Sequence, residues 1–172
     1  MIDMEIGTDK SSLTESSTPQ ISANESQSGP NLEKLVTFQL GETVYAIHAV
    51  MVAEVSQPLP LTPLPGAQPC LLGVSPLRGE IVANVDLRAM LGEKPARPAN
   101  PKSKVIVLKR ASAGATPIAF AVDRLGEITS VDIADIRLTQ NVTDLLIGEI
   151  SSETRCLKVV DHRKILGSIE PE

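Results

Sequence analysis

The sequence has few of the side chains on which base stacking, disulfide frameworks and metal sites depend. Its 172 residues include no tryptophan, one tyrosine, two phenylalanines, two cysteines and two histidines. Two thiols do not make a disulfide framework, and we expect Cys70 and Cys156 to be reduced. With a net charge of −5 and three aromatic residues, the chain offers neither a basic groove nor a stacking platform for nucleic acid.

Sequence motifs of enzymes and of metal or nucleotide sites are also absent. No histidine or cysteine pair has metal-site spacing, and no glycine-rich phosphate loop or nucleophile elbow occurs. We therefore predict no catalytic residue, no metal and no cofactor. For His48 and His162 we favour boundary and surface positions over catalytic roles, and for Asp123 a place in a turn.

No long apolar run is present either. None approaches the roughly 18 residues that span a bilayer, and the first residues lack the pattern of a signal peptide. We expect a cytoplasmic protein without direct membrane insertion. Residues 1–31 are acidic, rich in serine and threonine and poor in apolar side chains, and this composition predicts a disordered tail.

Residues 32–172 are predicted to fold mainly as short strands, which gives an all-β class with a few short helices. Residues 35–40 alternate apolar and polar side chains with the period of a half-buried strand. The other predicted strands are 44–47, 71–74, 80–85, 104–109, 117–122, 145–150 and 155–160. Helical turns are predicted at 50–55, 87–91 and 161–166, and irregular or polar connections at 58–69 and 129–143. Asp86 and Asp161 are predicted to be structural N-caps.

Two stretches of the chain look like copies of one unit. A Leu-Leu-Gly sequence at 71–73 and a Leu-Ile-Gly sequence at 146–148 are each followed, thirteen residues after the glycine, by an aspartate and a short helical pattern. The copies are 75 residues apart, and such self-similarity predicts duplicated subdomains. We expect two small β-barrels related by pseudo-symmetry, with approximate boundaries 32–94 and 103–172 and a proline-rich linker at 95–102.

The two copies differ in the charges of one hairpin loop. Arg78 in the first copy corresponds to Glu153 in the second, and Glu80 corresponds to Arg155. One interpretation is that both loops are solvated turns with arbitrary charges. The other is that Arg78, held by a tight turn at Gly79, points a fixed set of donors at a partner. Swapped charges also favour head-to-tail association between unlike halves.

Several short sequences, in this order and spacing, resemble the CheW-like coupling proteins of bacterial chemotaxis. They are Val-Thr-Phe-Gln-Leu-Gly at 36–41, Tyr-Ala-Ile at 45–47, Val-Ala-Glu-Val at 52–55, Leu-Arg-Gly at 77–79, Val-Asp-Leu-Arg at 85–88 and Val-Asp at 122–123. The resemblance covers residues 32–167.

The resemblance implies a fold of two five-stranded, SH3-like barrels and a non-enzymatic adaptor. Its partners would be the cytoplasmic tips of methyl-accepting chemoreceptors, the regulatory domain of the histidine kinase CheA and other CheW-like domains in rings. By position, the residues expected in receptor coupling are Val52, Glu54, Arg78 and Gly79. Candidates for the kinase or ring interface are Leu77, Glu80, Glu153 and Arg155.

Three residues depart from the usual family pattern: Pro76 before Leu-Arg-Gly, Asn84 in a strand, and His48. A buried asparagine needs a hydrogen-bond partner, so Asn84 is expected either to face outward or to have one. The departures leave open a divergent adaptor for a twitching, phototaxis or other non-flagellar pathway. A nucleic-acid-binding small barrel is the alternative from a different class.

Overall fold

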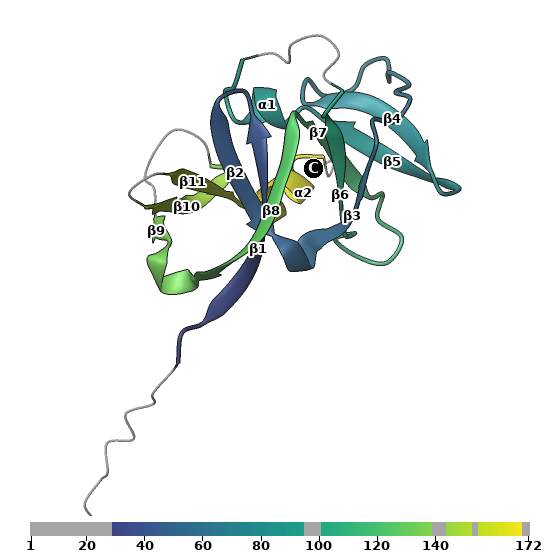
Figure 1. Cartoon of the computed structure of the whole chain (residues 1–172). Helices are drawn as coiled ribbons and strands as arrows, with labels where there is room; N and C mark the ends of the chain where they lie inside the picture. The colour runs from purple at the N-terminus through teal and green to yellow at the C-terminus, as the bar shows by residue number, and fades with distance from the viewer. Residues whose placement is uncertain (1–28, 95–100, 139–143, 153–154, 170–172) are drawn as a thin grey trace, which may run out of the picture.

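A computed structural model describes residues 29–94, 101–138, 144–152 and 155–169 of the chain. The predicted tail up to residue 28, most of the predicted linker and Glu153 lie outside the described residues. Figure 1 shows the strands gathered in two groups, with the short helix α1 at one end of them.

Strands make up most of the described residues. They are β1 (Leu32–Leu40), β2 (Thr43–His48), β3 (Val52–Ser56), β4 (Leu71–Leu77), β5 (Glu80–Val85), β6 (Lys104–Leu108), β7 (Ile118–Val122), β8 (Arg124–Asp132), β9 (Arg137–Leu138), β10 (Leu146–Ser151) and β11 (Cys156–Val160). The helices are α1 (Leu87–Met90) and α2 (His162–Gly167), and the 3-10 turns are η1 (Ala49–Met51) and η2 (Ile133–Asp135).

The strands form two sheets with the same arrangement, and each sheet combines strands from both halves of the chain. One sheet has the order β8-β1-β2-β11-β10-β9, and the other has the order β3-β6-β7-β5-β4. Each sheet therefore takes its β1–β2 or β6–β7 hairpin from one half of the chain and its other strands from the opposite half. The predicted all-β fold of two pseudo-symmetric units is confirmed, with β9 as a short sixth strand in one sheet.

The two copies in the sequence also have equivalent structures, and even individual contacts are repeated. The β4–β5 and β10–β11 hairpins both have a register shift just before a glycine, Gly73 or Gly148. A Cβ atom at Gly73 would lie 2.3 Å from the carbonyl oxygen of Thr62, and one at Gly148 would lie 2.3 Å from that of Arg137. Both pairs are 75 residues apart, so glycine is required twice for the same close approach of two backbones.

Two sequence-based assignments are wrong in a similar way. Residues 52–55, predicted as part of a helical turn, lie in strand β3, and only Ala49–Met51 turns, as η1. The polar residues 129–132, predicted as a connection, extend β8. Both segments pair with a strand distant in sequence, β3 with β6 and β8 with β1, and this pairing overrides the local pattern.

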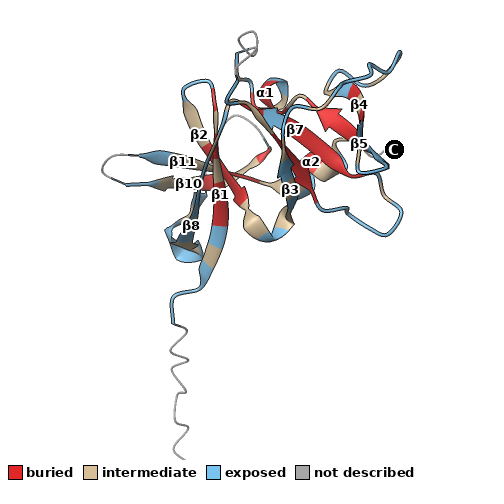
Figure 2. Cartoon of the chain, turned by 45° about the vertical axis from the view of Figure 1, so that its right-hand side comes forward, coloured by how far each residue is buried: buried red, intermediate tan, exposed pale blue. Residues whose placement is uncertain are grey.

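The main core lies between the two sheets. It contains all three aromatic residues of the chain, and Phe38 from one sheet has its ring centroid 5.6 Å from that of Phe120 in the other. Tyr45 stacks on Phe38 and is 2% exposed, so no aromatic side chain is available to stack on a base. Figure 2 shows this buried interior running through both sheets.

Polar contacts fix the ends of strands and helices around this core. Asp86 accepts a hydrogen bond from the Ala89 amide at the start of α1, and Asp161 accepts one from the Arg163 amide at the start of α2. Arg88, 8% exposed, forms an ion pair with Asp123. Burial alone would raise the pKa of Asp123, but the hydrogen bond from Arg88, the Gly41 amide and the Arg88 charge together hold it below its usual value.

Asn84 is buried, and its amide nitrogen donates to the Ser75 hydroxyl at 2.9 Å. Replacing Ser75 with alanine is expected to lower the free energy of unfolding by about 1–2 kcal/mol, because it leaves a buried amide poorly paired. Adding Asn84→Leu should recover most of that loss, since both polar groups are then removed. Urea unfolding of the two single variants and the double variant measures this coupling. Additive losses would show that the two side chains are energetically independent.

Candidate partner-binding site

The candidate site is built on the turn between β4 and β5. Leu77 pairs directly with Glu80, so Arg78 and Gly79 are the two central residues of a two-residue hairpin turn. Both have positive φ, 51° for Arg78 and 83° for Gly79, as the favoured hairpin turns require. A positive φ is uncommon for arginine, and here it fixes the direction in which the Arg78 side chain leaves the sheet.

Arg78 bridges the two edge strands of the five-stranded sheet. Its Nε atom lies 2.8 Å from Oε2 of Glu54, which comes from β3 at the opposite edge. The Arg78 side chain is 79% exposed and that of Glu54 is 25% exposed. The other carboxylate oxygen of Glu54, Oε1, is buried and has no hydrogen-bond partner among the described residues. The pair therefore presents a solvent-facing guanidinium above an acceptor that is not satisfied.

A groove of about 360 Å³ lies beside this ion pair. Its lining includes the apolar residues Leu77, Val82, Val107 and Pro117 together with several charged side chains. Val82 and Val107 belong to the small apolar cluster on one face of the five-stranded sheet. The site thus combines an apolar hollow with fixed charges, which is the composition of a protein-binding surface more than of a reaction centre.

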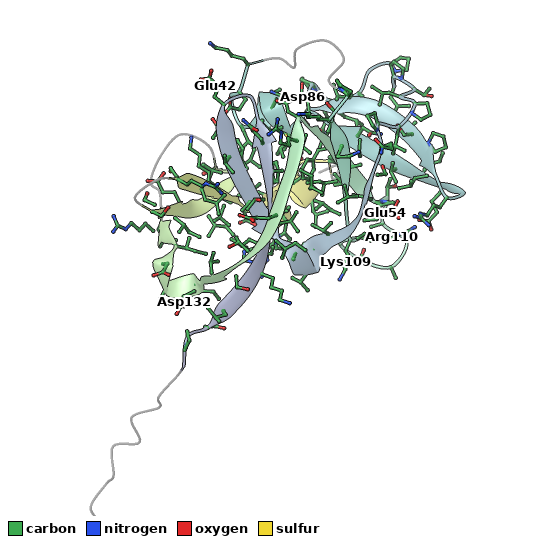
Figure 3. All side chains as sticks on the ribbon, in the orientation of Figure 1. Glu42, Glu54, Asp86, Lys109, Arg110 and Asp132 are labelled. Carbon is green, nitrogen blue, oxygen red and sulfur yellow. The ribbon has the colours of Figure 1, made fainter. Side chains whose placement is uncertain are left out.

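A second ion pair stands at the rim of the groove. Nη2 of Arg110 lies 2.5 Å from Oε1 of Glu80. Figure 3 shows Glu54, Lys109 and Arg110 on the same side of the molecule, away from Glu42 and Asp132. The sequence did not point to Lys109 or Arg110, because they enter the site only through the pairing of β6 with β3.

The structure does not bring all the predicted coupling residues together. Of these, Glu54 and Arg78 line the groove. Leu77 and Glu80, the candidates for the kinase or ring interface, line it as well. Val52 packs instead against the main core between the sheets. The cause is a register shift in β3 between Val52 and Glu54, which turns the two side chains to different faces.

The second sheet has a looser counterpart of the same ion pair. Glu127, which is 73 residues after Glu54, lies on β8, and its Oε1 is 3.6 Å from Nη1 of Arg155 at the β10–β11 hairpin. Both side chains are about three-quarters exposed, at 75% and 76%. The long distance and high exposure make this pair a weak one. The two copies of the unit therefore differ at the place where the loop charges are exchanged.

Neither a metal site nor a membrane span is found in the parts of the chain that the structure describes. No group of three histidine, cysteine, aspartate or glutamate side chains is placed to hold a metal ion within residues 29–169, apart from the undescribed gaps. None of the described helices is long and apolar enough to cross a bilayer.

Comparisons with known proteins agree with this architecture. The family model of the CheW-like domain matches residues 34–170. A chemotaxis protein CheW of Rhizobium meliloti (strain 1021) is 28% identical over 144 residues, covering 81% of this chain and 90% of the relative. One of Bacillus subtilis (strain 168) is 26% identical over 139 residues, covering 78% and 86%. The crystal structure of the scaffolding protein TtCheW from Thermoanaerobacter tengcongensis has the same fold, with a TM-score of 0.67 at 22% identity, covering 78% of this chain and 88% of that one.

Proposed function

Because the chain belongs to the CheW-like domain family, we propose that it is a non-catalytic adaptor in a bacterial chemosensory array. In this role it couples the cytoplasmic tips of methyl-accepting chemoreceptors to the regulatory domain of the histidine kinase CheA. Its place in the cell would be the cytoplasm, at the inner face of the membrane through the receptors. It needs no cofactor for this work.

The observation that carries the proposal is the fixed ion pair of Arg78 and Glu54 beside an apolar groove. An arginine held by a tight turn loses little conformational freedom on binding, and its planar guanidinium pairs well with carboxylates and carbonyl groups. Receptor contact is therefore assigned to Glu54, Arg78 and Gly79, while Val52 would act by holding the start of β3 against the core.

A second set of contacts would join the adaptor to the kinase or to other CheW-like domains. We place these contacts at Leu77, Glu80 and Arg155, with Glu153 as a further candidate from its position in the sequence. Glu80 and Arg155 occupy corresponding loops of the two copies with opposite charges. A contact between unlike halves of two molecules would bring such loops together and can close into a ring.

In this mechanism the adaptor acts by differential contact. A receptor in one signalling state would bind the groove better than a receptor in another, and the shared adaptor would bias the kinase toward one of its conformations. No bond is made or broken by the adaptor, and the size of the effect is limited by the difference between its affinities for the two receptor states.

Co-sedimentation tests the proposed function. Membranes that carry a chemoreceptor are mixed with the CheA kinase, with and without the adaptor, and the kinase in the pellet is quantified. We expect the kinase to pellet at least about tenfold more in the presence of the adaptor, which corresponds to about 1.4 kcal/mol of coupling. The same amount of pelleted kinase in both mixtures would refute the adaptor role.

A further inference from the structure

The only two histidines of the chain lie in contact with each other. His48 ends β2, and His162 is the first residue of α2. Strands β2 and β11 run parallel, with Ala46 opposite Val159, so their ends bring the two rings together. The ring centroids are 6.1 Å apart and the planes meet at 76°, an edge-to-face packing of two imidazoles. The sequence predicts a boundary position for His48 and a surface position for His162, and it gives no sign of this contact.

The charged neighbours of the two rings are few and differ between them. Nδ1 of His48 lies against the carboxylate of Glu33 on β1 and forms an ion pair with it when His48 is protonated, and Lys34 lines the same hollow of about 450 Å³. His162 follows Asp161, the N-cap of α2, and precedes Arg163. The His48 side chain is 15% exposed, so a charge on it would be screened only weakly from the second ring by water.

His162 is poorly prepared to accept a proton. Its Nδ1 atom is buried and has no hydrogen-bond partner among the described residues, so a proton there would be a buried donor without an acceptor. Burial lowers the pKa of His162, Asp161 opposes this effect, and the charges of His48 and Arg163 lower the pKa further. The surroundings of His162 therefore favour the neutral ring over the charged one.

We propose that the His48–His162 contact is a proton-operated latch between the β2–η1 connection and helix α2. With both rings neutral, the edge-to-face contact holds the first turn of α2 against the end of β2. When both rings are charged, they repel each other at this distance and the contact opens. No covalent step is involved, and the latch is a feature of the chain alone, independent of the proposed partners.

The latch lies where it can move both the core and the binding site. Ile165, one turn along α2, is fully buried in the main core. On the other side, η1 follows His48 directly and leads into β3, which carries Glu54. An effect on receptor binding through Glu54 would rest on the proposed function, whereas opening of the latch itself would not.

The sign of the stability change follows from the lowered pKa of His162. Between its folded and unfolded pKa values, the unfolded chain binds more protons than the folded one, so the free energy of unfolding rises with pH in that window. The folded state is therefore expected to have its full stability above about pH 6.5, the ordinary histidine value, and to lose part of it as the pH falls further. Lowered pKa values of Glu93 and Asp123 act only at lower pH, near the carboxylate range.

Proton NMR on the full chain tests the latch, because two histidines give only two imidazole ε1 signals. Both signals and the backbone amides of η1 and α2 are followed from pH 8 to pH 5. In His48→Gln, the titration midpoint of His162 is expected to move upward, since a repelling charge is removed. The amides of Ala49–Met51 and His162–Gly167 should follow the imidazole curves in the wild type.

Lys164→Gln is the matched control. Lys164 is an exposed residue of α2, and its charge is not among those acting on His162. Both titration midpoints should therefore stay where they are in the wild type. An unchanged His162 midpoint in His48→Gln, or η1 and α2 amides that do not respond to pH, would overturn the proposal. Either result would leave the proposed adaptor function untouched.

Discussion

Replacing Arg78 with glutamate is expected to weaken binding to a receptor cytoplasmic fragment by about 10- to 100-fold, the loss typical of an arginine at the centre of an interface. The new carboxylate would face Glu54, so the variant loses the guanidinium and gains a repulsion. Stability should hardly change, because the Arg78 side chain is 79% exposed and such pairs contribute about 0–1 kcal/mol. Titration calorimetry for affinity and urea unfolding for stability separate the two effects.

Arg155→Glu is the matched control for this prediction. It makes the same charge change at the corresponding hairpin of the other sheet, where the partner carboxylate of Glu127 is 3.6 Å away and exposed. Receptor affinity is expected to stay within about twofold. A double exchange, Glu54→Arg with Arg78→Glu, restores an internal ion pair but not the guanidinium at the turn, so receptor affinity should remain low. Equal losses in Arg78→Glu and Arg155→Glu would show that only net charge matters, and the site would be wrongly assigned.

Replacing either Gly73 or Gly148 with alanine is expected to lower the free energy of unfolding by about 3 kcal/mol, the upper end of the usual cost of overpacking. Each added methyl group would lie 2.3 Å from a backbone carbonyl oxygen, that of Thr62 or Arg137, and a backbone cannot rotate away as a side chain can. Gly73 also has a φ of +147°, which Gly148 does not share, so the loss should be at least as large in Gly73→Ala as in Gly148→Ala. Urea unfolding measures these losses, with one value for the dependence of the unfolding free energy on urea concentration used for both variants and the wild type.

Gly114→Ala separates this steric effect from backbone strain. Gly114 has a φ of +84° but no atom within 4 Å of the added methyl group, whereas Gly148 has the close contact without a φ in the left-handed range. Alanine at Gly114 should therefore cost only about 1–2 kcal/mol, the penalty of left-handed backbone. If Gly148→Ala were as mild as Gly114→Ala, the close approach of the two backbones would not be a constraint on the fold.

The repeat and the alternating strands could be predicted from the sequence, because alternation is a local pattern and the repeat shows as two similar stretches at a fixed separation. Period-two alternation marks β1, and the spacing of Gly73 and Gly148 marks the paired hairpins without any knowledge of what each glycine touches. The exchange of strands between the sheets could not be predicted. It depends on the parallel pairings of β2 with β11 and of β5 with β7, which join segments far apart in the chain and have no local signal.

The candidate site was predictable only in part for the same reason. Arg78 and Gly79 stand out because the conformation of a tight turn depends on a few adjacent residues. The position of Val52 on the opposite face from Glu54 depends on a register shift within β3, which nothing in the sequence marks. The entry of Arg110 into the groove and the contact of the two histidines depend on tertiary pairing alone.

The most direct test of the account is the rate of CheA phosphorylation by ATP on receptor-bearing membranes, measured with and without this protein. The account predicts a rise of at least about tenfold that requires receptor, kinase and adaptor together, that is lost with Arg78→Glu, and that is absent when the adaptor and ATP are mixed alone. A rate that is the same with and without the protein, or turnover of ATP by the protein itself, would contradict it.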